Sequence, residues 1–187
     1  MGFGFLLFGY FFFCDFTLGV PNTEMRFDML PDVFGWVLLF VGLLFASRYS
    51  KKLVVAKYIA AVMILPALFS LLHGLSMWRV FFADAFYTSV YPYLEVVIKF
   101  LFHYYLIFGL REIAEECGDQ KALCVRLKSN FILTLFCFFW IIGARIVLSF
   151  APEMQGYCML VSAFSTMVYL LLNAFTIFKM FREITAE

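Results

Sequence analysis

Long apolar stretches, separated by short polar ones, run along almost the whole chain. Six of them approach the roughly 20 residues that a helix needs to cross about 30 Å of hydrocarbon. They cover residues 3–20, 31–47, 53–74, 91–110, 130–150 and 157–178. Four of the five prolines lie at or just outside these limits, where a missing N–H group is tolerated, whereas Pro66 lies inside a span and should kink it. The pattern predicts an all-α, polytopic membrane protein with about six transmembrane helices.

Composition strengthens this prediction and excludes other classes. Apolar residues make up 65% of the 187 residues, against roughly 45 to 50% in a soluble domain. Charged residues are only 14% and aromatic residues 21%, which disfavours disorder, a secreted disulfide scaffold and binding of nucleic acid. The N-terminus has no basic segment or cleavage signal, so it is predicted to remain as the first span. We expect one transmembrane helical bundle over residues 1–187, with the lipid bilayer as its surroundings.

The net charge of +1 says little about partners, but the positions of the cations predict an orientation. One set of loops holds ten Lys and Arg residues, the other holds only Arg26 and Arg79, and Lys99 and Arg145 lie within spans. Because cytoplasmic loops are enriched in cations, both termini are predicted to be cytoplasmic. The ten residues are Arg48, Lys51, Lys52, Lys57, Arg111, Lys121, Arg126, Lys128, Lys179 and Arg182.

The segments between the spans carry further expectations. Residues 76–90 are rich in aromatic residues on the outer side and are predicted to form an interfacial helix or lid. The inner segment 111–128 is predicted to be a solvated helical hairpin broken at Gly118. Gly35 and Gly42, seven residues apart on the second span, indicate a close contact with another helix.

Ionisable residues inside the spans are the first candidates for a site. Glu95, Lys99 and His103 follow one another at four-residue steps, which places them on one face of the fourth helix. Asp15, Glu95 and Arg145 would each lie roughly 6 to 8 Å below the outer ends of their spans. Two interpretations stay open: a structural ion pair between Arg145 and Asp15 or Glu95, or a site that binds a ligand or a proton.

A polar stripe on the sixth span adds further candidates. Ser162, Thr166, Tyr169, Asn173 and Thr176 recur at steps of three and four residues, the period of one helix face. Such a face either forms hydrogen bonds between helices or lines a wet cavity. Asn130, Thr134 and Arg145 share a face of the fifth span, so the polar stripes of spans four, five and six are expected to converge around one interior space. The predicted ligand-binding residues are Asp15, Glu95, Lys99, His103, Arg145, Tyr169 and Asn173.

Metal and enzyme chemistry find little support in the sequence. Glu24, Asp28 and Asp32 are spaced four apart, but three carboxylates are few for a hard cation, and Asp32 is expected to begin the second helix instead. The five cysteines lack zinc-site spacing and are expected to be mostly reduced, and His73 and His103 lie toward opposite ends of their spans. Protease, hydrolase and nucleotide motifs are absent. We therefore expect no enzyme activity, no metal and no cofactor.

Two stretches resemble a group of small, uncharacterised integral membrane proteins of Gram-positive, Clostridia-like bacteria. Residues 27–43 and 107–123 carry the resemblance, above all through a D-x-L-P-D-x-x-G-aromatic pattern. In this chain the pattern is Asp28, Leu30, Pro31, Asp32, Gly35 and Trp36. The resemblance implies a multi-pass protein of the bacterial inner membrane and supplies no catalytic residue.

The predicted architecture is also similar to the substrate-binding subunits of energy-coupling-factor vitamin transporters, which dock on their partner through small residues; Ala56 and Ala60 offer such a motif. The first hypothesis is a small-solute binding or transport protein. Its outward-facing cavity would be lined by spans four to six, gated by residues 21–31 and 76–90, and suited to an amphipathic or aromatic ligand. The alternative is a non-catalytic subunit that assembles with another membrane protein and uses its buried charges for pairing alone.

Overall fold

The computed structural model describes residues 2–13, 17–19, 26–28, 32–74, 90–117 and 121–185. Within these ranges the chain is almost entirely helical, as predicted, with one short antiparallel pair of strands. In chain order the elements are α1 (Phe3–Phe11), β1 (Thr17–Gly19), β2 (Arg26–Asp28), α2 (Asp32–Ala46), α3 (Lys51–Gly74), α4 (Tyr91–Glu116), α5 (Lys121–Phe150), the 3-10 turn η2 (Pro152–Met154) and α6 (Gln155–Thr185).

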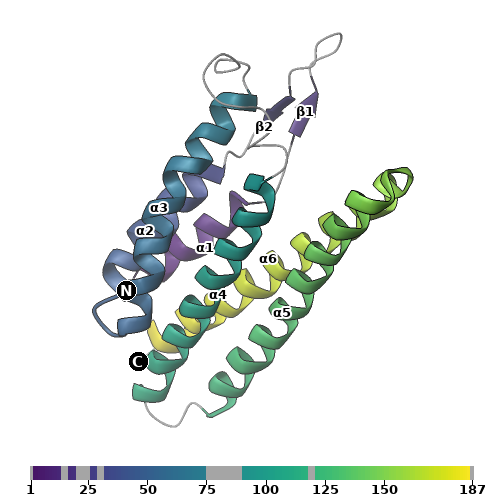
Figure 1. Cartoon of the computed structure of the whole chain (residues 1–187). Coiled ribbons are helices and arrows are strands. Elements are labelled where there is room, and N and C mark those ends of the chain that lie inside the picture. The colour runs from purple at the N-terminus through teal and green to yellow at the C-terminus, as the bar shows by residue number, and fades with distance from the viewer. Residues whose placement is uncertain are drawn as a thin grey trace.

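The six helices are arranged as a closed ring. Each helix packs on the next one in the chain, and α1 also packs on α6, which closes the ring (Figure 1). Both chain ends lie at one end of the bundle, whereas β1 and β2 lie at the other (Figure 1). The turn between α2 and α3 lies at the end that holds the termini, beside the last turns of α4, where Lys52 pairs with Glu112. The predicted cytoplasmic segments therefore share one end of the molecule.

Four helices, α3 to α6, are long and apolar enough to cross a membrane. Large apolar side chains cover their outer faces; Phe139 on α5 is 69% exposed and Leu160 on α6 is 70% exposed. Surface of this kind is unfavourable in water but matches the hydrocarbon of a bilayer. These helices support the predicted polytopic membrane protein.

The first predicted span is wrong in extent. α1 ends at Phe11, and residues 17–19, expected to continue the helix, form β1 instead, with Thr17 opposite Asp28. At 1.5 Å per residue, the nine residues of α1 extend about 14 Å and the fifteen of α2 about 22 Å, both short of about 30 Å of hydrocarbon. The part of the chain described here thus holds four long apolar helices rather than six.

The other boundaries agree better with the sequence pattern. α4 continues to Glu116 and α5 begins at Lys121, so the inner segment is helical on both sides of Gly118, as predicted. Pro66 lies inside α3, as expected from its place in the third span. The proposed lid and gate fall mainly on residues 20–25, 29–31 and 75–89, which lie outside the described residues.

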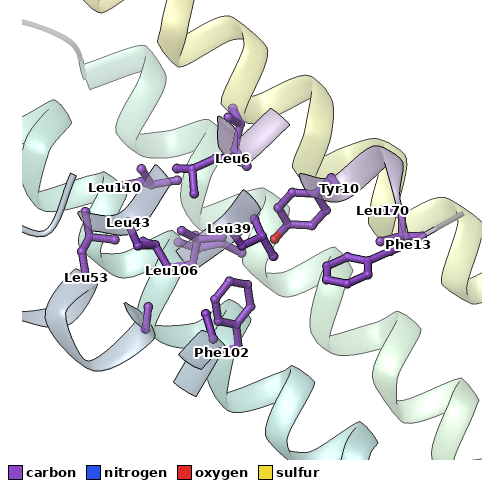
Figure 2. Packing of buried hydrophobic residues seen from close by; sticks show 14 of the residues in the cluster. Leu6, Tyr10, Phe13, Leu39, Leu43, Leu53, Phe102, Leu106, Leu110 and Leu170 are labelled. Atoms are coloured by element: carbon purple, nitrogen blue, oxygen red, sulfur yellow. The ribbon is translucent and has the colours of Figure 1, made fainter. Parts of the chain in front are cut away.

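Glycines allow α1 and α2 to approach each other closely. A Cβ atom on Gly42 would lie 2.8 Å from the carbonyl oxygen of Gly2, and one on Gly35 would lie 3.0 Å from that of Gly9. The predicted helix contact at Gly35 and Gly42 is therefore confirmed. Its reason is steric, because the backbone of α1 occupies the space that a side chain on α2 would need. Behind this contact lies a dense apolar core, into which the Tyr10 ring is directed near Leu39 and Phe102 (Figure 2).

Replacing Gly42 by alanine should separate α1 from α2. We expect Gly42→Ala to lower the free energy of unfolding by about 1 to 3 kcal/mol, because the new methyl group overlaps backbone atoms that cannot rotate away. Gly4→Ala is the matched control, since nothing lies within 4 Å of its Cβ position and alanine favours the helix. Thermal unfolding in detergent measures both; equal melting temperatures would contradict the close contact.

Candidate functional site

Lys99 lies between two carboxylates that come from different helices. Its Nζ is 2.7 Å from Oε1 of Glu95, one turn earlier on α4, and 3.3 Å from Oδ2 of Asp32, the first residue of α2. The three side chains are only 17% to 27% exposed, and Nζ also lies 5.6 Å from the centre of the Phe13 ring. We call Asp32, Glu95 and Lys99 the ion cluster; it carries one net negative charge and joins α4 to α2.

Asp32 is the member of the ion cluster that the sequence analysis missed. It begins α2 as predicted, yet its carboxylate also reaches a lysine 67 positions further along the chain. No spacing rule signals such a contact, because it depends on how α2 and α4 pack. Of the three carboxylates considered for a cation site, Glu24 and the side chain of Asp28 lie outside the described part of the chain. Among the described residues, no group of three or more His, Cys, Asp or Glu side chains is placed so that it could hold a metal ion.

His103, one turn below Lys99 on α4, is enclosed by aromatic rings. The ring centres of Tyr10, Phe138 and Tyr169 lie 5.2 to 5.6 Å from its own, and they come from α1, α5 and α6. Its Nδ1 is 2.6 Å from the carbonyl oxygen of Lys99. A carbonyl only accepts hydrogen bonds, so Nδ1 carries the hydrogen and Nε2 presents a lone pair in the neutral ring.

Two buried polar atoms of this aromatic cage have no hydrogen-bond partner among the described residues: Nε2 of His103 and the hydroxyl oxygen of Tyr10. Both side chains are 1% exposed. Most buried polar atoms in proteins are paired, so these two are unusual. They lie where four of the six helices meet, since His103 is on α4 and its ring contacts come from α1, α5 and α6.

An amide and hydroxyl network joins the inner halves of α5 and α6. Nδ2 of Asn173 donates to Oγ1 of Thr134 at 3.2 Å and to the carbonyl oxygen of Tyr169 at 2.7 Å. Nδ2 of Asn130 donates to Oδ1 of Asn173 at 3.3 Å and to Oγ1 of Thr176 at 3.1 Å. The polar stripes of spans five and six thus meet as expected, whereas the hydrogen bonds of this network do not include the stripe of span four. Of the two roles considered for the polar stripe, hydrogen bonds between helices or the lining of a wet cavity, Asn173 has the first.

Arg145 lies near the other end of α5, beside a cavity of about 560 Å³ between α4, α5 and α6. The Tyr93 hydroxyl donates to the carbonyl oxygen of Arg145 at 3.3 Å and lies 2.9 Å from Oγ of Ser149, which also donates to that carbonyl. These contacts join the first turns of α4 to the last turns of α5. The cavity is lined by Pro92, Tyr93, Ala144, Arg145, Leu148, Ser149, Cys158, Met159 and Ser162.

The expected pair between Arg145 and Glu95 is not formed. Glu95 pairs with Lys99 on its own helix, and no carboxylate within the described ranges makes a salt bridge with Arg145. Asp15, the other expected partner, lies outside the described residues. The structure thus brings together Glu95, Lys99, His103 and Tyr169 along one side of the bundle interior, places Asn173 one turn from Tyr169, and sets Arg145 in a separate location.

Ala56 and Ala60 do not provide a docking surface. Both are 0% exposed and lie inside the core, on the side of α3 that faces the other helices of the chain. A second protein can contact them only if the bundle opens. The small-residue motif suggested by the transporter resemblance is therefore explained by packing within this chain.

The fold and these groups define a helical protein with four long apolar helices, an interior ion cluster and a cavity at one end of the bundle. Comparison with protein-family models, with curated proteins and with solved structures finds no match to this chain. The family resemblance of the two motif stretches and the architectural resemblance to vitamin-transporter subunits remain predictions.

Removing the positive charge from the ion cluster should destabilise the fold. We expect Lys99→Met to lower the free energy of unfolding by about 3 kcal/mol, because two carboxylates then face each other with little access to water. The double variant Lys99→Met with Glu95→Gln should recover part of this loss. Lys52→Met is the control: it breaks an exposed pair with Glu112 and should cost less than about 1 kcal/mol. Chemical unfolding in detergent measures all three, and equal losses at positions 52 and 99 would refute a structural role of the cluster.

Proposed function

We propose that this protein binds a small amphipathic solute, as a solute-binding or transport protein, in the cavity between α4, α5 and α6. The observation that carries the proposal is the cavity itself. Its volume of about 560 Å³ lies within the roughly 300 to 1,000 Å³ common among small-molecule sites. It lies between spans four to six, the helices expected to line an outward-facing site.

The position of the cavity along the bundle supports an outward opening. Pro92 is the second residue of α4, Ser149 is the last but one of α5, and Met159 lies in the second turn of α6. These three lining residues are thus close to the helix ends that point away from the basic inner segments. If the excess of cations marks the cytoplasmic side, the cavity opens toward the outside.

The lining has the mixed chemistry that an amphipathic ligand requires. Leu148, Met159 and Pro92 provide apolar surface, while Tyr93 and Ser149 provide hydroxyl groups. Sites for small molecules commonly combine a mostly apolar wall with a few polar groups that fix the orientation of the ligand. Arg145 is the member of the predicted ligand-binding set that belongs to this lining.

The remaining described candidates stabilise the walls of the cavity in this proposal. The ion cluster holds α4 against α2, and the network around Asn173 holds α5 against α6. Neither the ion cluster nor the network around Asn173 belongs to the lining of the cavity. A binding site on rigid supports is the arrangement that favours a defined ligand geometry.

Filling the cavity should remove a bound solute. Native mass spectrometry of protein gently extracted from its own membranes should show a reproducible small-molecule adduct, which Ala144→Phe abolishes because its ring occupies the cavity. Ala163→Phe is the matched control, since Ala163 lies on α6 and is exposed. Melting temperatures should show that both variants fold. An adduct that survives Ala144→Phe would overturn the proposed site. A stoichiometric protein partner without any adduct would favour the alternative, an assembly subunit.

A further inference from the structure

We propose that the ligand of the cavity is an amphipathic anion whose carboxylate or phosphate binds the guanidinium of Arg145, an inference that rests on the proposed function. The starting observation is the charge of the lining. Among the described residues that line the cavity, Arg145 is the one with a charged side chain, and guanidinium groups are cations that bind anions. The cavity therefore carries a fixed positive charge.

No acidic side chain in the described ranges neutralises that charge by a salt bridge. A charged residue within a membrane-spanning helix is costly unless it is paired or faces water, and it commonly marks a binding site. The ion cluster does not supply a negative charge to Arg145, because Glu95 and Asp32 both pair with Lys99. An anion supplied by the ligand would complete the pairing of Arg145.

The groups around Arg145 fit the head of such an anion. Guanidinium groups bind carboxylates and phosphates through two parallel hydrogen bonds, which fixes the direction of the ligand. Tyr93 and Ser149 anchor the backbone of Arg145 through its carbonyl oxygen, so the base of its side chain is held in place. The hydroxyl of Ser162, on the facing helix α6, offers a further donor to a head group.

The apolar lining fits the tail. Pro92, Leu148 and Met159 present surface that gains free energy by covering a hydrocarbon chain. A cationic amphiphile would match the same apolar surface, but its head would meet the positive charge of Arg145. The charge of the cavity thus selects among amphiphiles of equal tail length.

Three probes with a ten-carbon chain separate the requirement for an anionic head from the requirement for an apolar tail: decanoate, decanol and decyltrimethylammonium. Equilibrium binding is measured on the full chain in phosphatidylcholine nanodiscs. We expect decanoate to bind at least about tenfold more tightly than the other two, the value of one charge-assisted hydrogen bond. Arg145→Gln should remove this preference, so that decanoate binds no more tightly than decanol. Arg126→Gln, which removes an exposed cation from the other end of α5, should change nothing.

The outcomes distinguish the inference from the function on which it rests. If Ala144→Phe abolishes binding of the probes while Arg145→Gln leaves decanoate affinity unchanged, the cavity binds ligands but the anion inference is wrong. If Ala144→Phe leaves the affinity of every probe unchanged, the proposed function fails as well. Equal affinity for all three probes would also overturn the anion inference.

The anion can come from a free amphiphile or from a phospholipid head group, and a second lipid separates the two. Phosphatidylglycerol is added to the nanodiscs in increasing proportion. If decanoate affinity falls, and falls only when Arg145 is present, an anionic lipid occupies the site. If decanoate affinity does not change, the site takes a free anion. Both results support an anion at Arg145 and identify its source.

Discussion

The neutralisation of Lys99 inside the bundle is the constraint on which the arrangement of the helices depends. A lysine in the apolar interior requires a nearby negative charge, and here Glu95 from its own helix and Asp32 from α2 both supply one. Asp32 is the first residue of α2, and its Oδ2 lies 3.3 Å from Nζ of Lys99. His103 lies one turn further along α4, where it contacts aromatic rings from α1, α5 and α6. The ion cluster thus links α4 to the first residue of α2, a helix that is not its neighbour in the ring (Figure 1).

The two halves of the α5–α6 pair are held together differently. Asn130, Thr134 and Asn173 cross-link its inner half through hydrogen bonds, which are the usual means of joining helices in a membrane. In the other half, Tyr93 of α4 contacts Arg145 and Ser149 of α5, and a cavity lies between the three helices. A bundle that is tightly joined at one end and hollow at the other can bind a solute at the hollow end without disturbing the core. This asymmetry supports the proposed function.

The sequence predicted the helical membrane class, most helix ends, the Gly35 and Gly42 contact and the convergence of Asn130 with Asn173, since all of these arise from local periodicity or composition. It failed where tertiary contacts decide. Residues 12–19 are as apolar as a helix interior, so hydropathy could not reveal that β1 pairs with β2. The expected pairing of Asp15 with Arg145 stays a prediction, since Asp15 lies outside the described residues. The pair of Asp32 with Lys99 depends on packing between distant segments, which a single sequence does not encode as spacing.

The outward-facing cavity is the central claim, and site-directed cysteine labelling tests it most directly. The five native cysteines are replaced, and Ser162→Cys introduces one thiol into the cavity lining. In intact cells, a membrane-impermeant maleimide should label this thiol, and decanoate should slow the reaction. Labelling that appears only after the membrane is permeabilised would show that the cavity faces the cytoplasm. No labelling on either side would show that solutes cannot enter it, and either result would contradict the account.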